Sequence, residues 1–142
     1  MKVKILSVIA TLVFFTISSL YGQNVKVWDT LYKQSKSVKD RRDRISQISD
    51  TANSDFAPLI YNILQEQLEY VLSNDVQEKK YYDEWVSIAV GIASRLKIEK
   101  VSDMFRSLYQ KVQTPRIKGD VMVALGKTGD ISQVDFINNE LR

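Results

Sequence analysis

From residue 56 onward, apolar side chains recur at intervals of three and four, which is the spacing of an amphipathic helix. The two-residue alternation that would predict strands does not recur past the first 22 residues. We therefore expect four helices of ordinary length, each with one face in a core. Their apolar stripes are Phe56, Leu59, Ile60, Ile63, Leu64, Leu68, Val71 and Leu72; Val101, Met104, Phe105, Leu108, Tyr109 and Val112; Ile117, Val121, Ala124 and Leu125; and Val134, Ile137 and Leu141.

Two further helices are predicted in front of and between these four. The segment 81–96, which includes Tyr82 and Trp85, is apolar around most of its circumference, so we expect a central helix buried on more than one side. Its aromatic residues are expected to pack between helices. Trp28, Leu31 and Tyr32 predict an N-terminal helix that covers one end of the fold.

Residues typical of helix ends separate the predicted helices. Thr114 precedes Pro115 and predicts a helix start with proline at the first position, where its missing N–H is not needed. Gly129 predicts a left-handed C-terminal cap. Asp130 predicts the next N-cap, with Gln133 three residues on as in a capping box. The connections are short, so consecutive helices should be antiparallel neighbours.

Residues 1–22 read as a segment separate from the helical domain. Lys2 and Lys4 precede an apolar run over 5–17, and small and polar residues follow up to Gly22. This order is typical of an export signal, and we expect cleavage after Gly22 and a mature domain of residues 23–142 that is periplasmic or secreted. The alternative is an uncleaved membrane anchor, for which a run of about 15 residues falls short of the ~20 that a spanning helix needs.

Composition narrows the classes of function. Without the signal, 18 Lys and Arg face 17 Asp and Glu, so the mature chain is nearly neutral and lacks the footprint of a nucleic-acid binder. There is no cysteine and no histidine, which removes disulfides, thiol catalysis, the commonest general base and the commonest metal ligand. The neighbouring carboxylates Glu66 and Glu69, and Asp83 and Glu84, look like ordinary solvated faces. We therefore predict no enzyme activity, no cofactor and no metal.

The charges of the mature chain are unevenly distributed along it. Residues 26–44 sum to +4, residues 45–84 to −6 and residues 85–142 to +3. Such alternation can guide an acidic partner, an anionic envelope surface or self-association. The alternative is a solvated outer helix over 36–44 whose ion pairs contribute little.

A short pattern recurs at the ends of three predicted helices. Ile48-Ser49, Val90-Gly91 and Leu125-Gly126 each place a branched apolar residue before a small one, and the copies are offset by 42 and 35 residues. These offsets are close to the period of helical-hairpin repeats. We expect hairpins over roughly 38–73, 79–113 and 115–142, with unrelated amphipathic helices as the alternative.

The third copy carries the most specific pattern. Residues 116–130 read Arg-Ile-Lys-Gly-Asp-Val-Met-Val-Ala-Leu-Gly-Lys-Thr-Gly-Asp. This segment resembles the short HEAT-like repeat of phycobilisome-lyase-type proteins, although Ile131 stands where that family often has proline. In such a repeat Ala124 and Gly126 would let the paired helix approach closely, and Leu125 would fill the core. The resemblance implies an α-solenoid and does not carry lyase activity over, because the repeat hosts many functions.

Together these features predict an all-α protein, a short α-solenoid of about three antiparallel HEAT-like hairpins plus an N-terminal helix. We expect a protein-binding scaffold or adaptor of the bacterial envelope, with a protein partner or self-association and no membrane contact after cleavage. The alternative is an exported protein that binds a small ligand or carbohydrate in an aromatic groove.

The partner surface is predicted from the second helix of each hairpin, because these helices line up side by side in stacked hairpins. Phe136 is the anomaly in this set, since an aromatic off the apolar stripe either anchors a partner or packs on a further repeat or subunit. The residues turned away from the apolar stripes are Asn62, Gln65, Glu69, Asp103, Arg106, Gln110, Ser132, Phe136 and Asn139.

Overall fold

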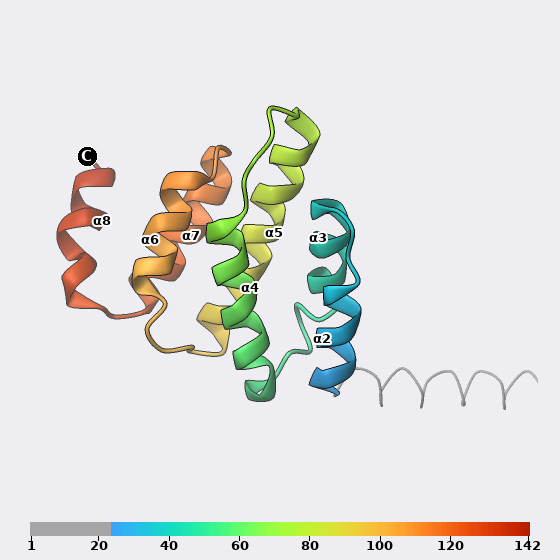
Figure 1. Cartoon of the computed structure of the whole chain (residues 1–142). Helices are drawn as coiled ribbons and strands as arrows, with labels where there is room; N and C mark the ends of the chain where they lie inside the picture. The colour runs from blue at the N-terminus through green and yellow to red at the C-terminus, as the bar shows by residue number, and fades with distance from the viewer. Residues whose placement is uncertain (1–23) are drawn as a thin grey trace, which may run out of the picture.

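The computed structural model describes residues 24–142, so the predicted export signal and its cleavage site lie outside the described residues. The described chain is all-α, as predicted, with seven antiparallel α-helices and no strand (Figure 1). The α-helices are α2 (Val25–Lys33), α3 (Val38–Ser46), α4 (Ala57–Glu69), α5 (Val76–Arg95), α6 (Ser102–Lys111), α7 (Pro115–Lys127) and α8 (Val134–Glu140), with 3-10 turns η1 (Ser54–Phe56) and η2 (Ile131–Gln133).

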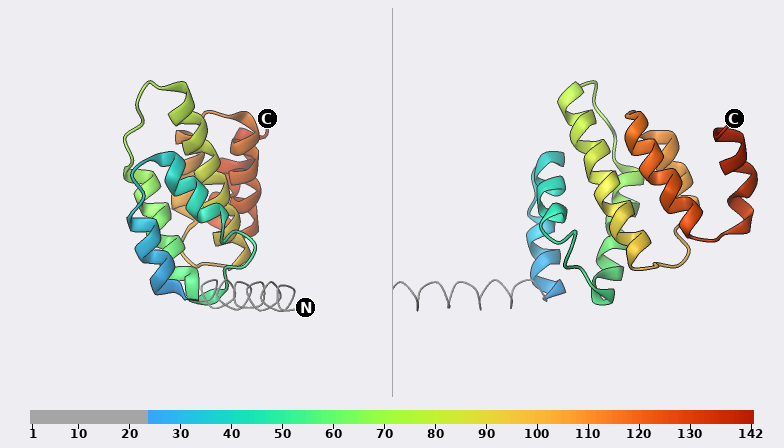
Figure 2. Two further views of the ribbon diagram at one scale, coloured as in Figure 1. Left: turned by 90° about the vertical axis from the view of Figure 1, so that its right-hand side faces the viewer. Right: turned by 180° about the vertical axis from the view of Figure 1, so that it is seen from behind.

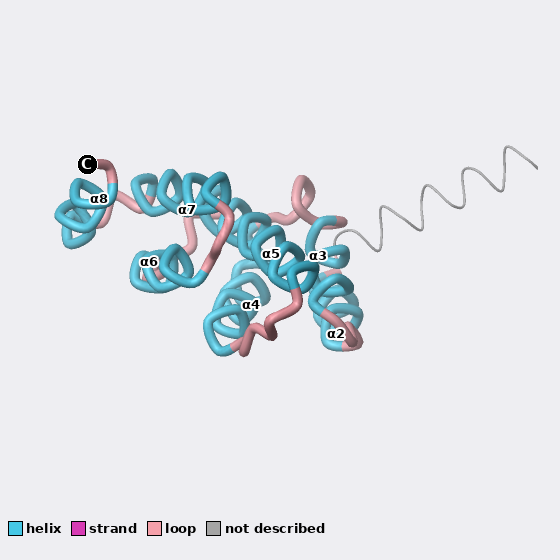
Figure 3. Tube along the Cα trace, turned by 90° about the horizontal axis from the view of Figure 1, so that it is seen from above, coloured by secondary structure: helices cyan, strands magenta, loops and turns pink. Residues whose placement is uncertain are grey.

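The helices form two rows, which are clearest from above (Figure 3). One row holds α3, α5 and α7, which face the viewer when the molecule is turned around (Figure 2). The other row holds α2, α4, α6 and α8. Helix α5 packs against α3, α4 and α7, so the predicted central helix is confirmed.

Consecutive helices differ in how closely they pair. The most extensive contacts between consecutive helices join α4 to α5 and α6 to α7. Each of these pairs spans a boundary between two hairpins of the sequence-based division, one near residue 75 and one near residue 114. Helices α4 and α6 also pack on each other and form the middle of the second row, which holds α2, α4, α6 and α8.

The core lies between the two rows. Trp85, Tyr82, Phe56 and Phe105 are fully buried there. The Tyr82 and Trp85 rings lie edge to face with centroids 6.0 Å apart, a favourable arrangement of aromatic quadrupoles. The expectation that these two aromatics pack between helices is therefore confirmed. The apolar members of the recurring pair pattern are also buried, namely Ile48, Val90 and Leu125.

Helix α4 ends earlier than its apolar stripe predicts. Tyr70 leaves the helical conformation with ψ of 127°, and Val71 is 86% exposed. The Lys111 ammonium group, at the end of α6, donates to the carbonyl oxygens of Gln67, Leu68 and Tyr70 at 2.5 to 2.9 Å. These carbonyls would otherwise continue the helix or remain unpaired, so a side chain of α6 terminates α4.

Two other helix ends are completed by residues distant in sequence. The buried carboxylate of Asp83 on α5 accepts the N–H of Thr114 at 2.7 Å and that of Gln113 at 3.2 Å. Thr114 occupies the N-cap position before Pro115, as predicted, but its own side chain makes no cap hydrogen bond. The Arg95 guanidinium donates to two carbonyl oxygens in the turn after α3, at 2.5 and 2.9 Å.

The turn between α7 and α8 confirms two predictions and corrects two. Gly129 has φ of +68°, and Asp130 caps η2 by accepting the Ser132 N–H at 3.0 Å. Gln133 does not complete a capping box, because it is buried and its amide donates to Asp103 at 3.0 Å. No neighbouring helix comes close to Gly126 in α7, since a Cβ placed there would meet no atom within 4 Å, so glycine is not required at this position.

Helix α8 is rotated relative to its predicted orientation. Val134 and Leu141, expected in the core, are 46% and 73% exposed. Phe136, expected on the exposed polar face, is half-buried, and its ring lies edge to face on that of Tyr109 with centroids 5.5 Å apart. The hydrogen bond from Gln133 to α6 and this aromatic pair fix the rotation, so Phe136 packs within the chain.

Candidate functional site

The predicted partner surface lies along one row of helices. Asn62, Gln65 and Glu69 are exposed on α4, Asp103, Arg106 and Gln110 are exposed on α6, and Ser132 and Asn139 are exposed around α8. Two of these residues contact the inward face of the C-terminal segment. Asp103 accepts the hydrogen bond from Gln133, and the Arg106 guanidinium carbon lies 4.7 Å from the Phe136 ring centroid. These two side chains therefore help to hold α8 on α6.

Asn62 also lines a hollow of about 240 Å³ between α2, α3 and α4. Beside it, the Tyr32 hydroxyl donates to Glu66 at 2.9 Å, and Arg41 Nε lies 2.9 Å from the other oxygen of the same carboxylate. Burial, reinforced by the Glu66 charge, raises the pKa of the Tyr32 hydroxyl, so it remains a donor. Tyr32, Arg41 and Glu66 are thus engaged with one another and tie α2 to α3 and α4.

A larger groove, of about 770 Å³, opens at the start of α6, where helices α5 and α7 end. We call it the lysine groove. It is bounded by the end of α5, the loop between α5 and α6, the start of α6 and the end of α7. Its lining residues are Ala93, Ser94, Lys97, Ile98, Glu99, Lys100, Val101, Ser102, Phe105, Lys127, Thr128 and Asp130.

The loop that forms one wall of the lysine groove has an unusual backbone. Lys97 and Lys100 have φ of 53° and 59°, in the left-handed region that favours glycine. At Lys97 the reason is a Schellman motif, in which the Lys97 N–H bonds to the Ser94 carbonyl and the Ile98 N–H to the Ala93 carbonyl. The chain therefore reverses sharply and holds both lysines at the rim.

The rim of the lysine groove is basic. Lys97, Lys100 and Lys127 are exposed, and none forms an ion pair within 4.0 Å of a carboxylate in the described part of the chain. The nearby acids are Glu99 and Asp130. With three ammonium groups and two carboxylates, the lining has a surplus of positive charge.

Asp130 is bound to the groove wall by hydroxyl groups. It accepts hydrogen bonds from Ser102 at 2.5 Å and from Ser132 at 2.7 Å. The bond from Ser102, followed by that from Ser132, holds the pKa of this carboxyl below its usual value of 3.8. A carboxylate stabilised in this way is a weak base, so its role is to cap η2 and to join α6 to the following turn.

Beneath the charged rim the lysine groove is apolar. Ile98 is half-buried and faces the space, and Ala93, Val101 and Phe105 are buried below it. The aliphatic stems of the lysines add further apolar surface. This combination suits a ligand that brings negative charge at two sides and an apolar group between them.

The sequence-based prediction did not find this groove. It assigned residues 126–130 to the end of a repeat and placed the partner surface on α4, α6 and α8. The available signal was the pair Lys97 and Lys100 in a loop, followed by Lys127 at a helix end. Asp103 and Asp130 stand three residues after Lys100 and Lys127, but neither forms an ion pair with its lysine in the described residues. That the three lysines meet depends on the antiparallel packing of α5, α6 and α7.

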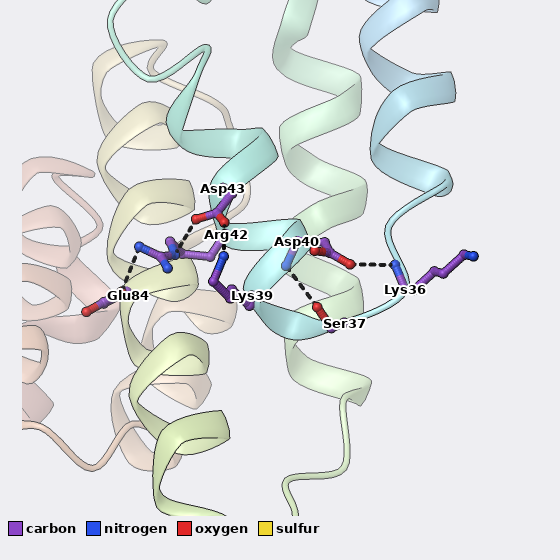
Figure 4. A network of polar contacts seen from close by, with 7 residues as sticks. All are labelled: Lys36, Ser37, Lys39, Asp40, Arg42, Asp43 and Glu84. Carbon is purple, nitrogen blue, oxygen red and sulfur yellow. Dashed lines mark hydrogen bonds and ion pairs between the residues drawn. The ribbon is translucent and has the colours of Figure 1, made fainter.

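The basic run over 36–44 has a different character (Figure 4). Lys39 pairs with Asp43 at 2.8 Å, and Arg42 lies 2.9 Å from Asp43 and 3.3 Å from Glu84 of α5. The Asp40 carboxylate accepts the Lys36 N–H at 3.2 Å, and the Asp40 N–H donates at 3.1 Å to the hydroxyl oxygen of Ser37, the N-cap of α3. Much of this charge is matched locally, which favours the solvated, ion-paired face over a binding site.

Comparison with models of protein families, with curated proteins and with solved structures finds no match to this chain. The resemblance to HEAT-like repeats therefore stays a prediction. Among residues 24–142, no helix is long and apolar enough to cross a membrane. In the same residues, no three acidic side chains are grouped so that they could hold a metal ion.

Proposed function

We propose that this chain is a non-catalytic binding scaffold, an exported HEAT-like α-solenoid whose lysine groove holds an acidic segment of a partner protein. The observation that carries the proposal is the groove itself. Three ammonium groups without ion-pair partners in the described chain surround an apolar floor. Unmatched charges gathered around a hollow mark it as a place for a ligand of opposite charge.

The solenoid part of the proposal is supported by the two rows of helices. In a solenoid each helix contacts its equivalents in the neighbouring repeats. Helix α5 lies between α3 and α7, and α6 packs on α4, as that arrangement requires. The buried positions Ile48, Val90 and Leu125 recur on successive members of the first row or directly after them.

A protein segment suits the lysine groove better than a sugar. Sugar sites commonly present an exposed aromatic face, and Phe105, the one aromatic residue among those lining the groove, is fully buried. The groove instead offers Ile98 and the lysine stems. An extended peptide with carboxylates on either side of one bulky apolar residue would match both features.

The test is a selection of peptides from a random display library on the immobilised protein, followed by binding titrations of the selected peptides. We expect acidic peptides with one large apolar residue. The triple variant Lys97→Glu, Lys100→Glu and Lys127→Glu should bind them about tenfold to a hundredfold more weakly, because exposed charge pairs contribute up to about 1 kcal/mol each.

A matched triple variant, Lys26→Glu, Lys36→Glu and Lys80→Glu, changes the net charge equally at exposed lysines outside the groove. It should bind the selected peptides as the parent does. Selection of neutral or basic peptides, or equal loss of binding in both triple variants, would refute the proposal. Binding to the parent should also weaken as salt is raised, because exposed charges are screened.

A further inference from the structure

The second row of helices exposes apolar side chains at its C-terminal end. Ile131, Val134 and Leu141 are 85%, 46% and 73% exposed. Val134 and Leu141 are seven residues apart and therefore lie on the same side of α8, and Ile131 precedes Val134 by one turn. We call these three residues the α8 face. Phe136 and Ile137 are the α8 residues that pack on the core instead.

Helix α2 stands at the opposite end of the same row (Figure 3), and it too carries apolar residues that do not pack on the core. Tyr32 is buried and bonded to α4, and Trp28 packs on the core. Val27 and Leu31, four residues apart, share another side of the helix and are only half-buried. Neither belongs to the apolar residues packed against the core. We call Val27 and Leu31 the α2 face.

The charges around the two faces have opposite signs. Residues 130–142 contain Asp130, Asp135 and Glu140 against Arg142, which sums to −2. Residues 26–44, in α2 and α3, sum to +4, and the ion pairs of Arg41 with Glu66 and of Arg42 with Glu84 reduce this surplus to +2. An α8 face meeting an α2 face would thus bring opposite charges together, whereas two α8 faces would bring like charges together.

The packing inside the chain indicates what kind of element fits these faces. Helix α4 lies between α2 and α6, and α6 lies between α4 and α8 (Figure 1). Within the described residues, α2 and α8 each have a neighbour in this row on one side only. The natural occupant of each free side is therefore another helix of the same row.

We propose that the α8 face of one molecule docks on the α2 face of a second copy of this chain. The contact joins two different surfaces, so each added molecule leaves one face of each kind free, and the assembly grows as an open chain unless its rotation closes a ring. Few apolar side chains take part, so the contact belongs to the small, weak class of interfaces. Association should consequently depend on protein concentration.

The experiment is sedimentation velocity of the purified protein over a range of concentrations. The mean mass of the parent should rise with concentration. Leu141→Asp disables the α8 face and Leu31→Asp disables the α2 face, and each variant alone should stay at the monomer mass. An equal mixture should form a pair that does not grow further, because one intact face of each kind remains available.

Val71→Asp is the matched control, since Val71 is 86% exposed in the loop after α4, outside both faces. This variant, and the triple variant of the lysine groove, should associate as the parent does, which separates this proposal from the proposed function. Circular dichroism checks that each variant is folded. Because Leu31 is half-buried, Val27→Ser gives a milder second test of the α2 face.

Three outcomes would overturn the proposal. The parent could remain a monomer at every concentration. The Leu31→Asp variant could still form a dimer on its own, which would show that two α8 faces meet. The mixture of Leu141→Asp and Leu31→Asp could fail to pair although both variants are folded.

Discussion

Lys97 occupies a backbone conformation that glycine normally fills. Its φ of 53° brings Cβ close to the following carbonyl, which costs an ordinary residue about 1–2 kcal/mol. The surrounding Schellman motif imposes this conformation, because both of its hydrogen bonds require a left-handed residue between Leu96 and Ile98. The lysine side chain is thus retained at the groove rim at a cost in stability.

We predict that Lys97→Gly raises the free energy of unfolding by about 0.5–1 kcal/mol, because relief of the left-handed strain exceeds the added freedom of glycine in the unfolded chain. Urea denaturation followed by circular dichroism measures this. Lys127→Gly, in the last turn of α7, should instead destabilise the protein, since that position is helical. A Lys97→Gly variant less stable than the parent would contradict the strained backbone.

Asp83 is a second residue whose role depends on a distant partner. Its carboxylate is buried and accepts the backbone N–H groups that precede α7. From the sequence it was predicted to be an ordinary solvated carboxylate like Glu84, and this prediction is wrong for Asp83 because the residue is only 2% exposed. The acceptor and its donors are 30 and 31 positions apart, so no local pattern reveals the pairing.

At the scale of the elements, Lys111 has the clearest consequence. Its ammonium group binds three carbonyl oxygens at the end of α4. We predict that Lys111→Met, which keeps the length of the side chain, lowers the free energy of unfolding by about 1–3 kcal/mol, because partly buried carbonyls lose a charged donor. Thermal and urea denaturation measure the loss.

Lys118→Met is the control for this prediction. Lys118 is also half-buried, and its Nζ lies 5.0 Å from the Tyr109 ring centroid, but no hydrogen bond of its ammonium group is found among the described residues. It should cost clearly less stability than Lys111→Met. Equal effects of the two substitutions would mean that the end of α4 does not depend on the ammonium group.

The elements themselves were largely predictable, and their rotations were less so. Three-to-four periodicity located α4, α6, α7 and α8 because core burial imposes that spacing, and the segment 81–96, apolar around most of its circumference, located much of α5. Helix α3 has no such stripe and was expected only as a charged outer helix. Helix α8 is only seven residues long, so the stripe through Val134 and Leu141 competes with contacts from Gln133 and Phe136. Here the hydrogen bond to Asp103 and the ring of Tyr109 decide which side faces inward.

The lysine groove escaped prediction for a related reason. Its walls come from the ends of three helices, and periodicity is least informative at helix ends, where the pattern stops. Lys97 and Lys100 carry no sign of their left-handed conformation, because glycine is the usual signal for it. Gly129, by contrast, was predicted correctly from that signal.

At the scale of the whole molecule, the proposed export depends on residues 1–22. Lys2 and Lys4, the apolar run over 5–17 and Gly22 predict a cleaved signal. We expect the mass of the protein isolated from its native cells to correspond to a chain that begins near Gln23. Intact-mass measurement of that protein tests this, and a chain that retains Met1 or Lys2 would contradict it.

The completion of α4 by Lys111 also bears on the order in which the chain is made. Leu68 leaves the ribosome 43 residues before the lysine that binds its carbonyl oxygen. Likewise, Arg95 is synthesised 43 residues after Ala52 and 46 residues after Ser49, whose carbonyl oxygens in the turn after α3 it binds. Early helices are therefore synthesised with unfinished ends, and each is finished by a side chain that emerges later. A nascent chain arrested before residue 111 should consequently be more open to proteases near Tyr70 than the finished protein.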